Sequence, residues 1–194
     1  EIGRRDAARA FWFVEDHRLF PYWRQVVGDY DYFFAIQRGA FLEEARALCP
    51  GRVAYLPCAA DPAVHQPLDL TPAERAEFGS PVAFVGAGYR NRRMAFVPLL
   101  DLGLRIWGSE WERAGRLDAV VQRQAARVST EDSVRVFNAA EVNLNLHSST
   151  WVDGVDPRGD FVNPRTFEIA AAGAFQLVDR RALLPEAFVP DREV

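Results

Sequence analysis

Apolar residues in the first part of the chain form short runs with the spacing of strands and helices in a parallel α/β sheet. Residues 10–14 are continuously apolar and end in polar residues, which predicts a strand that is buried on both faces and has polar groups at its carboxyl end. Residues 31–36 predict a second strand and residues 53–57 a third, while 38–48 has the spacing of an amphipathic helix. Strand, helix and strand in this order predict a βαβ crossover.

The pattern weakens between residues 58 and 71, where turns that contain proline replace it. We therefore predict a domain boundary near residue 68, with one domain over 1–67 and a second, also α/β, over 68–194. Thr130 is the predicted N-cap of the helix at 130–140. The pattern of the second domain predicts strands at 81–86, 104–108, 142–146 and 175–178, helices at 94–100, 130–140 and 164–172, and short helices within 111–127.

The stretch 163–173 has the order of a loop, a helix start, a short helix of small residues and a glycine stop. Pro164 suits the first helical turn, and Gly173 can end the helix in a left-handed conformation. Free N–H groups at a helix start, next to Arg165, favour an anion. Glu168, one turn later, is well placed for ribose hydroxyls if that anion is a nucleotide diphosphate. A core helix with one solvated glutamate is the alternative.

Residues 86–93 lie between a predicted strand and a predicted helix, where α/β sheets bind ligands. Gly86 and Gly88 would let the backbone approach a phosphate. The dinucleotide fingerprint needs a third glycine where Asn91 stands, so a nicotinamide-dependent oxidoreductase fits poorly. A glycine turn before a solvated basic helix start is the alternative. Charged donors for the phosphate would come from three arginines, Arg90, Arg92 and Arg93.

Composition and charge exclude several classes of protein. The formal net charge of −4 gives no electrostatic reason to expect nucleic-acid binding. No run of about eighteen apolar residues occurs, so we expect no integral membrane segment. Cys49 and Cys58 have neither the spacing of a disulfide framework nor that of metal ligands, and we expect buried thiols in a reducing compartment, the cytoplasm. We expect no metal site.

Residues 55–62, 84–86 and 163–173, followed by Asp179, resemble glycosyltransferases of the spore maturation protein CgeB type. These are GT-B glycosyltransferases with a donor domain like that of families 1 and 4. The resemblance covers nearly the whole chain and is most specific over 163–179. It implies an α/β fold of two Rossmann-like parallel-sheet domains that face a cleft, with the donor held mainly by the C-terminal domain. We expect both domains to be truncated in this chain.

The resemblance implies an enzyme that moves a sugar from a nucleotide-sugar donor to a glycan, protein or small-molecule acceptor. It favours retention of the anomeric configuration and a metal-independent site. No cofactor is expected, because the nucleotide sugar is itself a substrate. The alternative is a non-catalytic nucleotide-sugar or phosphate-binding protein of surface-structure or spore-coat assembly.

Several residues take roles from the resemblance by position. Glu168 resembles the second glutamate of the Glu-x7-Glu motif, which contacts the donor ribose, whereas Asp160 stands in place of the first and is one methylene shorter. The arginines after Gly88 stand where related enzymes place basic residues on the diphosphate. His147 follows a predicted strand and can enter the cleft. The predicted catalytic pair is Arg165 and Glu168, and the predicted donor-binding residues are Gly86, Gly88, Arg90, Arg92, Arg93, His147, Asp160, Asn163, Thr166 and Phe167.

Overall fold

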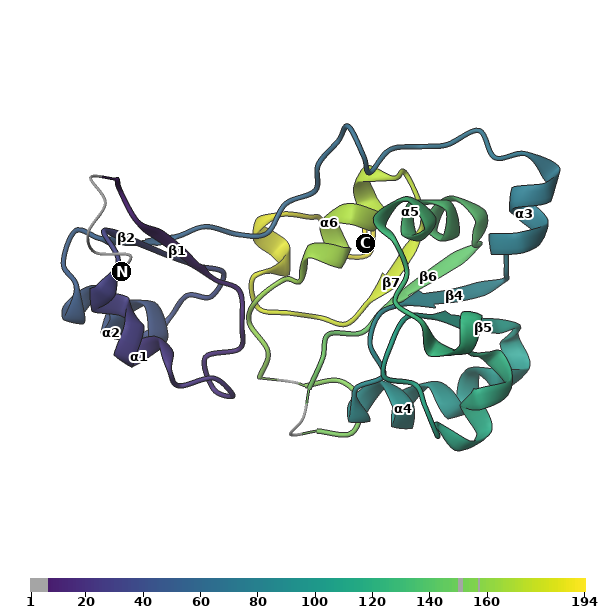
Figure 1. The fold of residues 1–194 in the computed structure, drawn as a ribbon, viewed down its shortest axis with the longest axis horizontal. Coiled ribbons are helices and arrows are strands. Elements are labelled where there is room, and N and C mark those ends of the chain that lie inside the picture. The colour runs from purple at the N-terminus through teal and green to yellow at the C-terminus, as the bar shows by residue number, and fades with distance from the viewer. Residues whose placement is uncertain (1–6, 150–151, 157) are drawn as a thin grey trace. The chain divides into compact units, whose positions relative to one another are not determined.

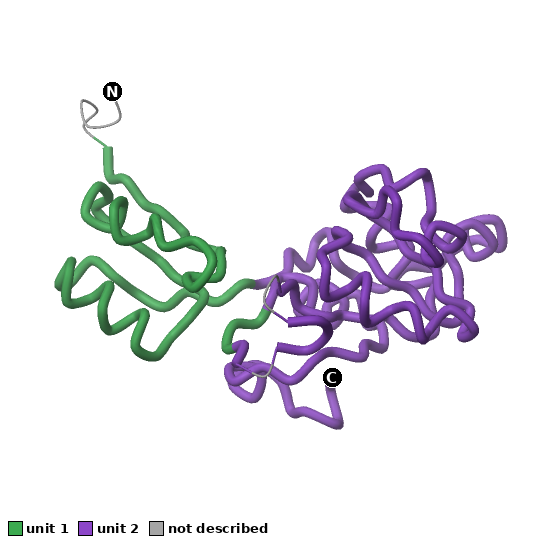
Figure 2. Tube along the Cα trace, turned by 90° about the horizontal axis from the view of Figure 1, so that it is seen from below, with its two compact units in different colours: residues 1–58, 160–162 green, residues 59–159, 163–194 purple. Residues whose placement is uncertain are grey.

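The computed structural model describes residues 7–149, 152–156 and 158–194 and shows an α/β protein with two parallel sheets (Figure 1). Contacts divide the chain into two compact units (Figure 2). Unit 1 takes the residues up to Cys58 together with Asp160–Val162, and unit 2 takes 59–159 and 163–194. The predicted fold class, with two separate parallel sheets, is confirmed.

Unit 1 is a three-stranded parallel sheet in the order β1-β2-β3, with its helices packed along it. Phe13 and Phe33 of the sheet share a core with Trp23 and Phe41 of the helices. The strand, helix and parallel strand confirm the predicted βαβ crossover. The elements of this unit are β1 (Ala10–Phe13), α1 (Trp23–Val26), the 3-10 helix η2 (Val27–Asp29), β2 (Tyr32–Ala35), α2 (Ala40–Leu48) and β3 (Val53–Tyr55).

The prediction that the first strand is buried on both faces is wrong. Phe13 is fully buried, whereas Trp12 on the same strand and Tyr32 on β2 are 43% and 51% exposed. Within the described residues, α1 and α2 contribute to the core on the face that carries Phe13. An apolar run therefore predicts a strand, but it does not tell whether one face or both faces of that strand are covered.

Unit 2 is a four-stranded sheet in the order β5-β4-β6-β7, with all neighbouring strands parallel. Among the described residues, no helix has the length and apolar character needed to cross a membrane. The elements of this unit are α3 (Pro72–Phe78), β4 (Val82–Val85), α4 (Arg90–Phe96), η3 (Val97–Leu102), β5 (Leu104–Trp107), η4 (Gly115–Val120), η5 (Arg123–Ala125), α5 (Thr130–Ala139), β6 (Val142–Asn145), α6 (Pro164–Ala171), β7 (Gln176–Val178) and η6 (Leu184–Glu186).

Helices cover both faces of the second sheet. Phe84 and Ile106 pack with residues of α4 and η4 in one core, while Val85 and Trp107 pack with residues of α3, α5 and α6 in another. From β4 the chain passes first to β5 on one side and then to β6 on the other (Figure 1). The strand order therefore reverses beside β4, and open α/β sheets bind ligands at such switch points.

The helix ends agree with the sequence at α6 and differ from it at α5. In α6, Pro164 occupies the first turn, and Gly173 follows the helix with a left-handed φ of 66°, as predicted. In α5 the N-cap is Ser129 instead of Thr130, because the Ser129 hydroxyl accepts the N–H of Asp132 at 3.1 Å. The N-cap of α5 therefore lies one residue earlier in the chain than the sequence predicts.

The segment at the start of unit 2 packs on the rest of that unit. The N–H of Leu68 donates to Oδ1 of Asn138 at 2.9 Å, and Nδ2 of Asn138 donates to the carbonyl oxygen of Gln66 at 3.2 Å. These bonds attach the segment to α5. The contact boundary therefore follows Cys58, earlier in the chain than the boundary predicted near residue 68.

Candidate functional site

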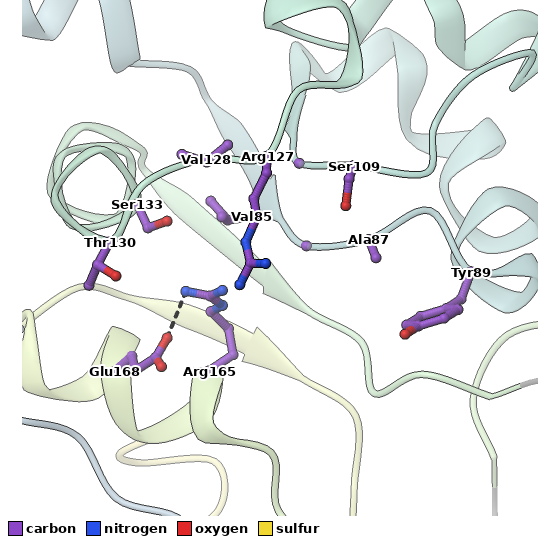
Figure 3. A pocket seen from close by; sticks show the side chains of 12 residues that line it. Val85, Ala87, Tyr89, Ser109, Arg127, Val128, Thr130, Ser133, Arg165 and Glu168 are labelled. Carbon is purple, nitrogen blue, oxygen red and sulfur yellow. Dashed lines mark hydrogen bonds and ion pairs between the residues drawn. The ribbon is translucent and has the colours of Figure 1, made fainter. Parts of the chain in front are cut away.

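A pocket of about 420 Å³ lies at the carboxyl ends of β4 and β5 in unit 2 (Figure 3). The loop after β4, with Tyr89, and the loop after β5, with Ser109, form one side of it. The other side comes from residues in the segment 127–133 at the start of α5, and from Arg165 and Glu168 of α6. The pocket therefore opens at the switch point of the sheet.

The glycines after β4 bring the two loops of the first wall together. A Cβ atom on Gly88 would lie 2.0 Å from the carbonyl oxygen of Glu110, so no larger residue fits without movement of the backbone. The N–H of Gly86 donates to the carbonyl oxygen of Trp107 at 2.8 Å, and that of Gly88 to Ser109 at 2.9 Å. Both amides are thus already paired. Backbone contact with a phosphate at this loop stays a prediction.

Arg165 and Glu168 lie one turn apart on α6 and both point into the pocket (Figure 3). Nη1 of Arg165 donates to Oε2 of Glu168 at 2.6 Å. Burial lowers the pKa of Arg165, while the charge of Glu168 acts in the opposite direction. An arginine stays charged at neutral pH under such a shift. The structure therefore brings the predicted catalytic pair together as a cation beside a carboxylate.

Arg127 lines the pocket although no motif in the sequence predicts a role for it. Its side chain extends from the segment before α5 toward the guanidinium of Arg165 (Figure 3). It is exposed, and among the described residues it forms no hydrogen bond or ion pair. Two guanidinium groups thus accompany one carboxylate, Glu168, and the excess positive charge favours an anionic ligand. The position of Arg127 just before a predicted helix start is the signal that points to it.

The α4 arginines serve other contacts, and none of them is among the described residues that line the pocket. Arg90 forms an exposed ion pair with Asp153 at 2.7 Å. Arg93 donates from Nε to the carbonyl oxygen of Gly88 at 2.6 Å and from Nη2 to that of Glu110. Arg93 therefore ties the loop after β4 to the loop after β5.

Arg92 is buried and holds the loop after β4 against the end of β6. Its Nε donates to the carbonyl oxygen of Leu146 at 2.9 Å, and its Nη1 donates to that of Ala87 at 3.0 Å. Burial lowers the pKa of Arg92 to about 10. Because these donors already bond carbonyl groups, the structure gives Arg92 a structural position, and a diphosphate role for the three arginines stays a prediction.

Asn163 and Thr166 fix the start of α6 on the sheet. Oδ1 of Asn163 accepts both the N–H and the hydroxyl of Thr166 at 3.0 Å. Asn145 of β6 donates to the Thr166 hydroxyl at 2.8 Å and accepts from Nδ2 of Asn163 at 2.9 Å. Thr166 is fully buried. These two predicted donor-binding residues thus position Arg165 and Glu168, which lie on the same helix.

His147 lies beside the same helix start and is 1% exposed. Its Nδ1 lies 2.7 Å from Oδ1 of Asp179, and its Nε2 accepts the N–H of Asn163 at 2.9 Å. Nδ1 therefore carries the proton of a neutral ring. Burial lowers the pKa of His147, outweighing the opposite effect of Asp179. Burial raises the pKa of Asp179, but the bonds from His147 bring it below its ordinary value. His147 is a structural link in this arrangement.

The last two predicted residues are not among the described residues that line the pocket. Asp160 belongs to unit 1, where its Oδ1 accepts from Nε2 of Gln37 at 2.9 Å and from the N–H of Phe161 at 2.7 Å. Phe167 packs its ring against Phe188, with 5.5 Å between the ring centres. Their contact with a donor stays a prediction.

The pocket can bind a ligand that combines negative charge with hydroxyl groups. Two guanidinium groups suit phosphate oxygens. Glu168 can accept from hydroxyls, and Ser109, Thr130 and Ser133 add hydroxyl groups of their own to the lining. Within the described part of the chain, no three His, Cys, Asp or Glu side chains gather as a metal site.

Comparisons with known proteins give a family for part of the chain and a fold for most of it. The glycosyl transferase-like family matches residues 90–194. Among solved structures, a sucrose-phosphate synthase from Thermosynechococcus elongatus matches with a TM-score of 0.54 and 14% identity, over 91% of this chain and 47% of that chain. The chain thus spans about half the length of that protein, and the likeness shows a GT-B-like fold. No curated protein matches the sequence.

Proposed function

The chain belongs to the glycosyl transferase-like family, and on that premise we propose that it is a glycosyltransferase that moves a sugar from a nucleotide-sugar donor to an acceptor. The pocket binds the nucleoside diphosphate part of the donor. The observation that carries this proposal is the meeting of Arg127, Arg165 and Glu168 in one pocket at the switch point of unit 2.

The arginines have the chemistry that the leaving group requires. When the bond from the sugar to the diphosphate breaks, negative charge grows on the diphosphate, and cations that are already in place stabilise it. Arg165 is fixed by Glu168 and by its position over the ring of Phe137, 5.2 Å from the ring centre. Arg127 has free donors among the described residues. In this proposal Arg165 is the preorganised cation, and Arg127 is the second arginine that binds the phosphates.

Glu168 has the chemistry to bind the ribose of the donor. One of its oxygens accepts from Arg165, and a carboxylate has about four lone-pair sites, so further hydroxyl groups can donate to it. In the proposed complex the ribose hydroxyls occupy these sites. The diphosphate then lies toward the two arginines, because it is joined to the ribose.

The finer assignments rest on the resemblance and are part of the proposal. The enzyme is of the CgeB type, retains the anomeric configuration and needs no metal and no cofactor besides the donor substrate. The acceptor is a glycan, a protein or a small molecule. The location is the cytoplasm, where cysteines such as Cys49 and Cys58 stay outside disulfides.

A non-catalytic nucleotide-sugar or phosphate-binding protein of surface-structure assembly is the second candidate. Asp160 favours it, because it replaces a glutamate of the motif and its Oδ1 is occupied by Gln37 and Phe161. The pocket around Arg165 and Glu168 serves either candidate. Turnover of the donor distinguishes the enzyme from the non-catalytic binding protein.

Thermal unfolding and product release test the proposal on the intact protein. UDP-, GDP-, ADP- and TDP-sugars are each added during thermal unfolding, because a ligand that binds the native state raises the unfolding temperature. Release of nucleoside diphosphate is then measured with and without acceptor sugars. We expect one donor class to stabilise the protein and to be turned over. Stabilisation without turnover favours the binding protein, and no stabilisation by any donor contradicts both.

A further inference from the structure

The segment that leads into unit 2 carries a histidine to the side of Glu168. His65 is 9% exposed, and its Nε2 lies 4.0 Å from Oε1 of Glu168. The same segment is held by Asn138 of α5, as described above. It also passes the end of α6, where a Cβ atom on Gly173 would lie 3.2 Å from Cγ of Pro67. The histidine therefore reaches Glu168 from a segment that is anchored on two helices.

A tight turn fixes the position of the imidazole ring. The N–H groups of Val64 and His65 donate to the carbonyl oxygen of Asp61 at 3.1 and 2.8 Å, and Oδ1 of Asp61 accepts the N–H of Ala63 at 2.9 Å. Nδ1 of His65 lies 3.1 Å from the same carbonyl oxygen. A carbonyl oxygen only accepts, so Nδ1 carries a proton. The other nitrogen, Nε2, faces the carboxylate.

The two oxygens of Glu168 thus have different neighbours. Oε2 accepts from Arg165 at 2.6 Å, and Oε1 faces His65. A ring fixed in this place limits the positions that Oε1 can take, so the carboxylate is held between the guanidinium of Arg165 and the imidazole ring of His65.

We propose that His65 is a positioning residue for Glu168, holding the carboxylate in the orientation that accepts the ribose hydroxyls of a nucleotide donor. The inference rests on the proposed function, because it takes Glu168 as the ribose acceptor. His65 acts through Glu168 and does not itself line the pocket. The segment at the start of unit 2 then contributes to donor recognition in that unit.

A matched pair of ligands tests this role. Titration calorimetry on the intact protein uses the tightest binder among UDP, GDP and ADP, and its 2′,3′-dideoxy counterpart, which has the same diphosphate charge but lacks the ribose hydroxyls. His65→Phe removes both nitrogens and keeps a ring. We expect it to weaken binding of the ribose form about three- to tenfold, because the carboxylate of Glu168 is then less well oriented for the ribose hydroxyls, and to leave binding of the dideoxy form unchanged.

Control variants separate positioning from folding. Gln66→Ala changes an exposed neighbour on the same segment and should leave both affinities unchanged. In a Glu168→Gln background, His65→Phe should have no further effect, because residues that act as a unit are not additive. Equal losses for both ligands, an unchanged affinity for the ribose form, or an additive effect in the double variant each overturn the inference. If the wild-type protein binds none of the nucleoside diphosphates, the proposed function itself fails.

Discussion

Arg127→Ala isolates the contribution of the second arginine in the pocket. Arg127 makes no internal hydrogen bond or ion pair with the described residues, so its removal breaks no contact of the free protein. The free energy of unfolding should change by no more than about 0.5 kcal/mol. A charge-assisted hydrogen bond to a ligand is worth about 1.5–3 kcal/mol. Affinity for a nucleoside diphosphate should therefore fall roughly ten- to a hundredfold.

Isothermal titration calorimetry of the intact protein measures this loss. Arg116→Ala is the matched control, because Arg116 is an exposed arginine on η4 that is not among the pocket residues. The difference between the two variants should shrink as salt is added, since salt screens exposed charges. If Arg127→Ala binds the diphosphate like wild type, or if Arg116→Ala loses as much affinity, Arg127 does not bind the phosphates.

Three further predictions concern neighbouring residues. Glu168→Gln should lower calorimetric affinity for a nucleoside diphosphate roughly ten- to a hundredfold, because charged hydrogen bonds worth about 1.5–3 kcal/mol each are lost; equal affinities would return Glu168 to a structural role. Arg92→Ala should instead lower the free energy of unfolding by about 1–3 kcal/mol, since the carbonyl groups that it bonds lose their donors. Urea unfolding measures this loss, and an unchanged urea midpoint would show that these bonds contribute nothing to stability. The free energy of unfolding should also fall as the pH drops below about 6.5, because burial lowers the pKa of His147 in the folded state and the unfolded state takes up the proton first. Urea titrations at about pH 7.5 and about pH 5.5 check this, and equal stability would contradict it.

The sequence predicts much of the fold because its local patterns are strong. The apolar runs at β4 and β5 and the stretch from Pro164 to Gly173 carry their own start and stop signals, and the structure has these elements there. The expectation for β1 is wrong because coverage of a strand depends on what packs against it. Exposed Trp12 and buried Phe13 look alike in an apolar run.

The candidate site is only partly readable from the sequence. Arg165 and Glu168 stand at helical spacing, so their meeting follows from local geometry. Arg92 and Arg93 look like phosphate donors in the sequence. They instead bond the carbonyl groups of Leu146, just after β6, and Glu110, in the loop after β5, which only the tertiary structure brings close. Arg127 has no motif around it, and its approach to Arg165 depends on the path of the chain before α5.

We propose that the pocket at the carboxyl ends of β4 and β5 binds the nucleoside diphosphate of a sugar donor. An experimental structure of the intact protein with a bound nucleoside diphosphate tests it most directly. We expect phosphate oxygens within hydrogen-bond distance of the guanidinium groups of Arg127 and Arg165, and ribose hydroxyls on the carboxylate of Glu168. Phosphates bound at the exposed face of α4 beside Arg90, with the pocket unfilled, would contradict it.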